Sequence, residues 1–384
     1  MATAEEIYKA LEGVNDPELG GNIVDLGMVT SVDVDERGVA TIGIALTVAE
    51  CPMRSQIEND TVRRIKNLPG ITDVVVETTA MTRAQRAELM SRARRWAREN
   101  AQPTNVSPNT RVVAVASGKG GVGKSSVSVN LALSLRSRGF SVGILDADIW
   151  GFSIPRMLGA RGPLTADDET RLIQPVFAHD VAVVSTGLII ESEETALMWR
   201  GLMLSKAVEQ FLTQVEWGDL DYLVVDLPPG TGDVLMALAR LLPQAEMLVV
   251  TTPQKAAQKV AVRVADMARR SHMPVIGVVE NMSGFECAHG QRYDLFGTGG
   301  GAELAETINA PLLGQIPLDS AVVRGGDEGQ PVVTDAEPGP AARAFHALAD
   351  RLVEIMPPAA DETCTGRIAK LIAQLDKDVA AASG

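Results

Sequence analysis

The segment 118–125 reads Gly-Lys-Gly-Gly-Val-Gly-Lys-Ser and matches the pattern G-x-x-x-x-G-K-[ST]. It lies between an apolar run that predicts a strand and a pattern that predicts a helix. In this setting the glycines let the backbone wrap around phosphate groups with its N–H groups pointing inward, and the N-terminal end of the helix adds positive charge. Lys124 is then expected to reach the β- and γ-phosphates of a nucleotide, and the Ser125 hydroxyl to ligate Mg²⁺.

Short apolar runs alternate with helical patterns from residue 111 to about residue 356. Near-continuous apolar strands between helices are typical of a parallel sheet that is covered on both faces. We therefore expect an α/β fold with a doubly wound, mostly parallel sheet, as in P-loop NTPases. The expected strands are Arg111–Ala116, Val142–Leu145, Val181–Ser185, Tyr222–Val225, Met247–Thr251 and Val275–Val279.

The part of the chain before this pattern differs in character, because two helical patterns there combine with three runs rich in Val, Ile and Thr. An Arg-rich helical stretch and a segment rich in Asn, Pro, Thr and Ser follow. The expected regions are a small α+β domain at 1–80, a basic helix and linker at 81–110, a nucleotide-binding domain at 111–356, and a C-terminal helical tail at 357–384.

The overall charge and the cysteine count limit the function. The chain has 35 Lys and Arg against 49 Asp and Glu, a formal net charge of −14, so we expect no nucleic-acid partner and interpret the Arg-rich stretch 83–98 as a solvated helix face. The segment 365–380 lacks aromatic residues and a strongly basic face, so we expect no membrane partner. Three cysteines, Cys51, Cys287 and Cys364, exclude a disulfide scaffold. With no leader-like segment and no apolar run of about 18 residues, a cytoplasmic location is expected.

The lysine at position 119 makes the phosphate loop more specific. Residues 119–125 resemble the deviant Walker A family of ATPases, which includes the MinD and ParA proteins and the Mrp/ApbC iron–sulfur carriers. The resemblance implies ATP and Mg²⁺ as cofactors, and a homodimer in which Lys119 contacts the phosphates of the partner's nucleotide as a positive charge acting in trans. The loop residues that it implies as nucleotide contacts are Gly118, Lys119, Gly120, Gly121, Val122, Gly123, Lys124, Ser125 and Ser126.

Two later strands end in carboxylates, and the carboxyl ends of strands are where ligands bind in doubly wound sheets. By resemblance, Asp148 orients the attacking water with Asp146 nearby, and Asp226 holds the Mg²⁺ shell. Asn281 matches the position that reads adenine, and Pro317 lies in the stretch that packs near the base. The residues expected to be catalytic are Lys119, Lys124 and Asp148.

Three motifs are more similar to the Mrp/ApbC carriers than to MinD or ParA. They are Asp-Ala-Asp-Ile-Trp-Gly at 146–151, Asp-Leu-Pro-Pro-Gly-Thr-Gly-Asp at 226–233 and Glu-Asn-Met-Ser at 280–283. Near the N-terminus, Asp-Pro-Glu at 16–18 and Thr-Val-Ala-Glu-Cys-Pro at 47–52 resemble the small domain of metal–sulfur cluster assembly factors. Cys51 is interpreted as a cluster-handling thiol or, alternatively, as a buried structural cysteine.

The expected cluster motif departs from the family pattern. These carriers usually have Cys-x-x-Cys shortly after Asn-Met-Ser, so that two subunits bridge one [4Fe–4S] cluster. Here Cys287 is present, but position 290 is glycine. His289 is a candidate replacement ligand, because two Cys and two His across a dimer suit a [2Fe–2S] centre. The alternative is an exposed loop that has lost its cluster.

From these motifs we expect an ATP-binding, slowly hydrolysing, homodimeric carrier that transfers iron–sulfur clusters to apo-proteins or works with cluster assembly factors. A MinD/ParA-like positioning ATPase, and a nucleotide-switch scaffold without its own cluster, are the alternatives.

Overall fold

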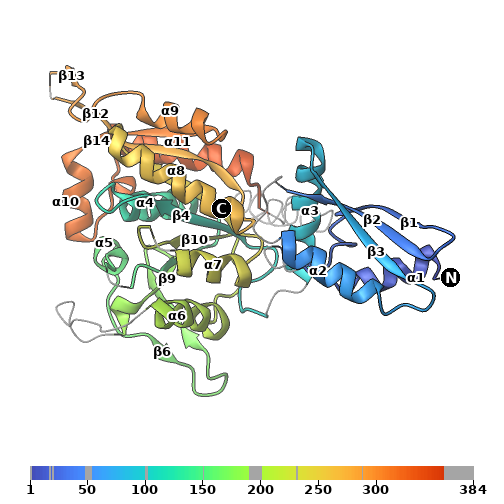
Figure 1. Ribbon diagram of the computed structural model, residues 1–384. Coiled ribbons are helices and arrows are strands. Elements are labelled where there is room, and N and C mark those ends of the chain that lie inside the picture. The colour runs from blue at the N-terminus through green and yellow to red at the C-terminus, as the bar shows by residue number, and fades with distance from the viewer. Residues whose placement is uncertain are drawn as a thin grey trace, which may run out of the picture. The chain divides into compact units, whose positions relative to one another are not determined.

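The computed structural model describes residues 2–16, 19, 21–47, 54–99, 103–149, 151–189, 201–230, 232–287 and 289–358 (Figure 1). The chain divides into two compact units, Met1–Ala101 and Gln102–Gly384, and each is described by itself below. The predictions for Cys51 and Cys364, and for the helical tail from residue 359 onward, lie outside the described residues.

The first unit is a three-stranded sheet with helices packed on it. Strand β1 is antiparallel to β2, and β3 is parallel to β2. The basic helix α3 belongs to this unit, because its Leu89 and Ala93 are buried in the same apolar core as Ile7 of α1 and Ile57 of α2. The elements are α1 (Ala4–Leu11), β1 (Val29–Val34), β2 (Val39–Leu46), α2 (Arg54–Ile65), β3 (Asp73–Ala80) and α3 (Arg83–Glu99).

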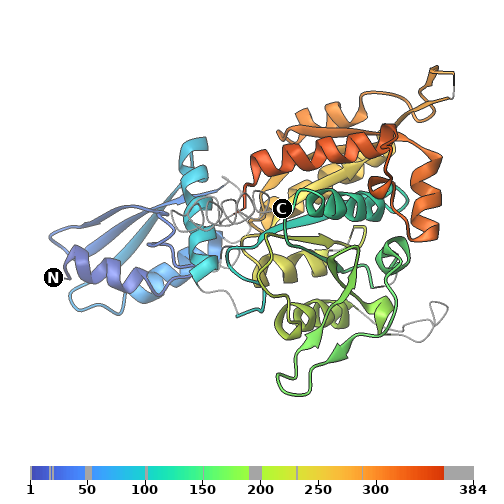
Figure 2. The ribbon, with the colours of Figure 1, turned by 180° about the vertical axis from the view of Figure 1, so that it is seen from behind.

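The second unit contains a larger mixed sheet with helices on both faces (Figures 1 and 2). Its elements up to β10 are β4 (Arg111–Ser117), α4 (Lys124–Arg136), β5 (Val142–Asp146), α5 (Ile154–Leu158), β6 (Thr165–Ala166), β7 (Ile173–Gln174), β8 (Val176–Ala178), β9 (Val181–Ser185), η1 (Thr186–Leu188), α6 (Gly201–Gln214) and β10 (Tyr222–Asp226). The later elements are α7 (Gly232–Leu241), β11 (Glu246–Thr251), α8 (Lys255–Arg270), β12 (Val275–Glu286), β13 (Arg292–Tyr293), α9 (Gly300–Thr307), β14 (Leu312–Leu318), α10 (Ser320–Glu328), η2 (Val332–Thr334) and α11 (Pro340–Ile355).

The strand order across this sheet is β13-β12-β11-β4-β10-β5-β9-β8, with β14 also paired to β12. The six strands expected from the sequence are β4, β5, β9, β10, β11 and β12, and all their pairings with one another are parallel. Only the short edge strands β8 and β13 pair antiparallel in the described part of the sheet. The expected doubly wound, mostly parallel fold is therefore confirmed.

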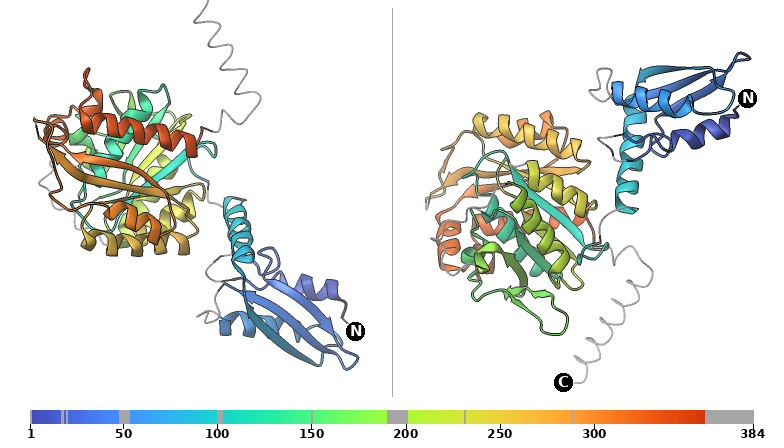
Figure 3. Two further views of the ribbon diagram at one scale, coloured as in Figure 1. Left: turned by 90° about the horizontal axis from the view of Figure 1, so that it is seen from above. Right: turned by 60° about the horizontal axis from the view of Figure 1, so that its bottom comes forward.

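Two apolar layers enclose the sheet. Helices α6, α7, α8 and α9 bury their apolar sides on one face, and α4, α5 and α11 on the other (Figure 3). Because both faces are covered, the central strands are apolar along almost their whole length. Across the described residues, no helix is long and apolar enough to cross a membrane.

Candidate nucleotide-binding site

The phosphate loop connects β4 to α4 at the carboxyl edge of the sheet. Gly121 and Gly123 both have φ of 78°, a backbone conformation that side chains rarely adopt. A Cβ at Gly120 or Gly121 would meet no atom within 4 Å, so the loop backbone is open there to an incoming phosphate chain. By contrast, a Cβ at Gly118 would lie 2.5 Å from the backbone of α8, so this glycine is needed for packing.

Lys124, the first residue of α4, points into a group of carboxylates. Its Nζ lies 2.6 Å from Asp226 Oδ2 and 4.0 Å from Asp148 Oδ2. The Ser125 hydroxyl donates to the same Asp226 oxygen at 2.7 Å. Lys124 and Asp226 are 6% and 0% exposed, so this ion pair is shielded from water. The following residue, Ser126, lies in the first turn of α4, where its carbonyl accepts from the Asn130 amide at 2.8 Å.

Asp146 and Asp226 end neighbouring strands, and their Cα atoms are register partners. Asp146 is fully buried and accepts from the Ser185 hydroxyl at 3.1 Å. Burial and then the charge of Asp226 raise the pKa of Asp146 from 3.8 to about 7, against the opposing effect of Lys124. Burial also raises the pKa of Asp148, whose side chain is 14% exposed. Of the carboxylates Asp146, Asp148 and Asp226, Asp148 is thus the one that is accessible from outside.

The second lysine of the motif has a different environment. Lys119 is half-buried, and its Nζ donates to Gln254 Oε1 at 3.2 Å. Gln254 is the residue before α8, so this contact joins the phosphate loop to that helix. Among the described residues, no ion pair joins Lys119 to the carboxylates that surround Lys124.

Asn281 and Pro317 are brought together, as the sequence motifs imply. Asn281 is in β12 and Pro317 in β14, where Asn281 pairs in register with Ile316. The Asn281 side-chain amide donates to the carbonyl of Val122 at 2.9 Å, and a Cβ at Gly123 would lie 2.2 Å from it. The base-recognition candidate therefore packs directly on the phosphate loop.

Cys287 and His289 lie where the chain turns from β12 into β13. The turn is closed by hydrogen bonds of 2.9 Å from Gly290 N to Cys287 O and from Cys287 N to Gln291 O. Cys287 is half-buried and not in a disulfide, and His289 is exposed. Gly290 has φ of 77°, which explains the glycine at the position where the family pattern has its second cysteine.

The strand that leads to this turn is irregular. Met282 and Gly284 both have positive φ, and the pairing of β12 with β14 shifts in register between Asn281 and Phe285. Glu280, fully buried, accepts from the Ser283 hydroxyl at 2.7 Å and from the Gln315 amide at 2.8 Å. These contacts fix the bulge between the base-recognition candidate and Cys287.

Several of these contacts were not predicted from the sequence. The missed residues are Ser185, Gln254, Glu280 and Ser128, whose hydroxyl donates to Asp226 Oδ1 at 2.6 Å. Ser128 had a usable signal, since it follows Lys124 by four residues and so shares its helix face. Ser185 had one too, because it ends a predicted strand as Asp146 does. Gln254 binds Lys119, which is 135 residues away in the sequence, and had no such signal. Glu280 had one, because its partner Ser283 stands three residues later in the motif at 280–283.

The arrangement suits Mg²⁺ and a nucleotide. Ser125 and Asp226 offer the hard oxygen atoms that Mg²⁺ prefers, and Mg²⁺ usually takes its remaining ligands from phosphates and water. Among the described residues no three Cys, His, Asp or Glu side chains group as metal ligands.

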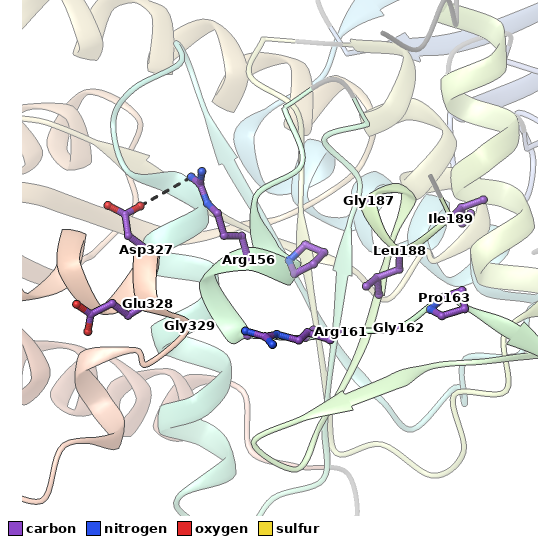
Figure 4. Close-up of a pocket in the computed structure, with 13 residues that line it drawn as sticks. Arg156, Arg161, Gly162, Pro163, Gly187, Leu188, Ile189, Asp327, Glu328 and Gly329 are labelled. Atoms are coloured by element: carbon purple, nitrogen blue, oxygen red, sulfur yellow. Dashed lines mark ion pairs between the residues drawn. The ribbon is translucent and has the colours of Figure 1, made fainter. Parts of the chain in front are cut away.

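A cavity of about 820 Å³ lies beside α5 and the end of α10 (Figure 4). Arg156 and Arg161 line it together with Asp327 and Glu328, and Arg156 forms an ion pair with Asp327 at 4.0 Å. Its charges balance, and none of the predicted site residues line it. The predicted nucleotide contacts therefore lie at the sheet edge and not in the lining of this cavity.

Comparison with known proteins agrees with this geometry. Residues 109–353 match the family model described as NUBPL iron-transfer P-loop NTPase, and residues 4–78 match that of an iron-sulfur cluster assembly protein. The chain belongs to the NUBPL iron-transfer P-loop NTPase family. The resemblance to Mrp/ApbC-type carriers with an N-terminal assembly-factor domain is thereby confirmed, and the chain is an ATPase of the P-loop class.

Relatives of this family are similar over most of the chain. An iron-sulfur cluster carrier protein from Mycobacterium leprae is 46% identical over 357 residues, which cover 90% of this chain and 91% of that protein. One from Synechocystis sp. is 39% identical, with coverage of 92% and 97%. A nucleotide-binding protein from Archaeoglobus fulgidus, solved in complex with ADP, has a TM-score of 0.51 and 37% identity over 59% of this chain and 88% of its own. MinD from Pyrococcus horikoshii, with a TM-score of 0.50 and 20% identity over 65% and 98%, shares the fold.

Proposed function

We propose that the chain is an ATP-dependent carrier that holds an iron–sulfur cluster between two copies of itself and transfers it to apo-proteins. The observation that carries this proposal is the position of Cys287. This thiol follows directly on β12, the strand whose Asn281 contacts the phosphate loop. A single strand therefore connects the nucleotide site to the proposed cluster ligand.

At the nucleotide site, Mg²⁺·ATP supplies the phosphoryl group that is released on hydrolysis. Lys124 binds its phosphates, and the backbone of Gly120 and Gly121 cradles them. Ser125 and Asp226 hold Mg²⁺, and Asp148, as the accessible carboxylate, orients the attacking water.

Lys119 makes the site depend on a second copy. In the single chain its ammonium group binds Gln254. In the proposed homodimer it leaves this contact and stabilises phosphate charge on the partner's nucleotide. Hydrolysis is then slow until two nucleotide-bound chains meet, which makes it a switch.

The cluster is the cargo of this switch. One chain offers the Cys287 thiolate and the His289 imidazole on an accessible turn, and two chains together offer four ligands. Two thiolates and two imidazoles suit a [2Fe–2S] cluster better than a [4Fe–4S] cluster. An accessible turn also lets a recipient protein approach the cluster.

Anaerobic reconstitution with iron and sulfide tests this proposal on the full chain. We expect wild type to gain a visible absorption band and about two iron atoms per dimer. Cys287→Ala should lose both, while Cys364→Ala, the matched control, should retain them. If only Cys51→Ala loses the iron and the absorption band, the cluster belongs to the first unit. If wild type gains no cluster, the carrier proposal is contradicted.

One observation favours a second function. Position 290 is a glycine held in a conformation that disfavours cysteine, so the turn is built without the second thiolate of the family pattern. A nucleotide-switch scaffold that acts through its N-terminal domain would have this feature. The same experiment separates the two, because a scaffold hydrolyses ATP but gains no iron at Cys287.

A further inference from the structure

Ser128 makes a contact at the nucleotide site that the family motifs do not include. Its hydroxyl donates to Asp226 Oδ1 at 2.6 Å, and both residues are fully buried. The other acceptor near the hydroxyl, the carbonyl of Lys124, is farther away at 3.2 Å and uncharged. The hydroxyl has a single proton to donate, and its hydrogen bond to the charged carboxylate is stronger than one to the carbonyl.

The two oxygens of Asp226 have different kinds of partner. Oδ2 accepts from Lys124 Nζ at 2.6 Å and from the Ser125 hydroxyl at 2.7 Å. Both of these donors are the groups that a P-loop uses on bound Mg²⁺·nucleotide. Oδ1 accepts from Ser128, which lies one turn further into α4 and behind the phosphate loop.

Nucleotide binding therefore removes the partners of one oxygen and leaves the partner of the other. Without a donor on Oδ1, the Asp226 carboxylate would be free to rotate when Lys124 and Ser125 turn to the nucleotide. A buried carboxylate with a missing partner is costly, and its orientation is poorly fixed.

We propose that Ser128 is a positioning residue for the Mg²⁺ site. It holds Oδ1 of Asp226, so that Oδ2 faces the Mg²⁺ shell once Lys124 and Ser125 have left it. This inference rests on the proposed role of Ser125 and Asp226 in holding Mg²⁺. It requires no contact between Ser128 and the nucleotide.

The same helix offers a matched control. Ser134 is also fully buried in α4, but its hydroxyl has no hydrogen-bond partner among the described residues. Ser134→Ala and Ser128→Ala remove the same atom from the same helix. Only the second removes a donor from Asp226.

The test is the affinity of the full-length chain for a fluorescent ADP analogue, titrated with Mg²⁺ and again with EDTA. We expect the affinity of Ser128→Ala in EDTA to stay within about twofold of wild type. The factor by which Mg²⁺ raises the affinity should be about 10-fold smaller in Ser128→Ala than in wild type. Ser134→Ala should behave as wild type in both titrations. Ser128→Thr, which keeps the hydroxyl, should recover most of the gain. Thermal unfolding of each variant checks that it is folded.

Three outcomes are decisive. If Mg²⁺ does not tighten binding to wild type, the proposed Mg²⁺ coordination is wrong. If it tightens wild type and Ser128→Ala equally, the role of Ser128 is overturned and the coordination stands. If Ser128→Ala and Ser134→Ala lose the gain to the same extent, packing of α4 is the cause, and the positioning role is overturned as well.

Discussion

The carboxyl edge of the sheet and the turn after β12 carry the two halves of the proposed function, and they are built in opposite ways. At the sheet edge, Lys124, Asp146 and Asp226 are almost fully buried, and every one of them has a hydrogen-bond or ion-pair partner. At the turn, Cys287 is half-buried and His289 is exposed, and backbone hydrogen bonds from Gly290 to Cys287 and from Cys287 to Gln291 close it.

This difference follows from what each region handles. A phosphate chain needs preorganised donors and excluded water, and these require a rigid buried site. A cluster that is passed to another protein has to be reached from outside, and in the proposed dimer its ligands come together only when two chains meet. Substitutions at the sheet edge should therefore affect stability and turnover together, while substitutions at the turn should affect only the cargo.

The largest effect is expected for Lys124→Ala. It leaves Asp226 without its buried cation, so the free energy of unfolding should fall by about 3–5 kcal/mol, and ATP turnover should fall by about 10³-fold. Urea unfolding and phosphate release measure the two effects. Arg240→Ala, which breaks the exposed pair with Glu209, is the control and should cost less than about 1 kcal/mol. A similar cost for both variants would contradict the buried pair.

Asp146→Asn should change how stability depends on pH in the absence of nucleotide. The pKa of Asp146 is raised to about 7, so its contribution to stability is fully present below its unfolded value of 3.8 and is lost as pH rises through about 7. The asparagine has no such loss. Relative to the variant, wild type should lose stability over this range by up to about 4 kcal/mol, measured by urea unfolding at several pH values. Parallel pH curves would show that Asp146 is not held in its neutral form.

Gly290→Cys restores the second thiol of the family pattern at the turn. A Cβ at position 290 meets no atom within 4 Å, but the positive φ strains a cysteine there, at a cost of about 1 kcal/mol. The added thiol should raise the iron content after reconstitution to about four atoms per dimer. Gly297→Cys is the matched control, because Gly297 also has positive φ and open space around it. Equal iron in both variants would mean that position 290 does not face a cluster.

The smallest effect is expected for Cys287→Ala on stability. A half-buried side chain on a turn contributes little, so the free energy of unfolding should stay within about 0.5 kcal/mol of wild type, with nucleotide affinity unchanged. Chemical denaturation and a nucleotide titration check this. A loss above about 2 kcal/mol would show that the turn is part of the folded core.

The fold and the phosphate loop were predictable because their signals are local. A glycine pattern between a strand and a helix, and apolar strands that end in Asp146 and Asp226, can be recognised from neighbouring residues. The contact between Ser128 and Asp226 was missed, because it joins residues 98 apart and only the position of Ser128 on the helix face of Lys124 indicated it. Strand β14, whose seven residues include a glycine and a proline, was not predicted either.

The irregular end of β12 was not predicted from the sequence either. It depends on a left-handed Met282 and on the buried Glu280 carboxylate, which binds groups of β14 and α9. Nothing in the local pattern indicates that this strand continues to Glu286 and delivers Cys287 to a turn. The sequence identifies Cys287 as a candidate ligand, but only the structure connects it to the nucleotide site.

The proposed carrier function requires that two copies of the chain hold one cluster through Cys287. Native mass spectrometry of the anaerobically reconstituted full chain, with Mg²⁺·ATP present, measures this. We predict a species with the mass of two chains plus a single iron–sulfur cluster, which is absent from Cys287→Ala. A cluster carried by a single chain, or a dimer that forms with nucleotide and contains no iron, would contradict the claim.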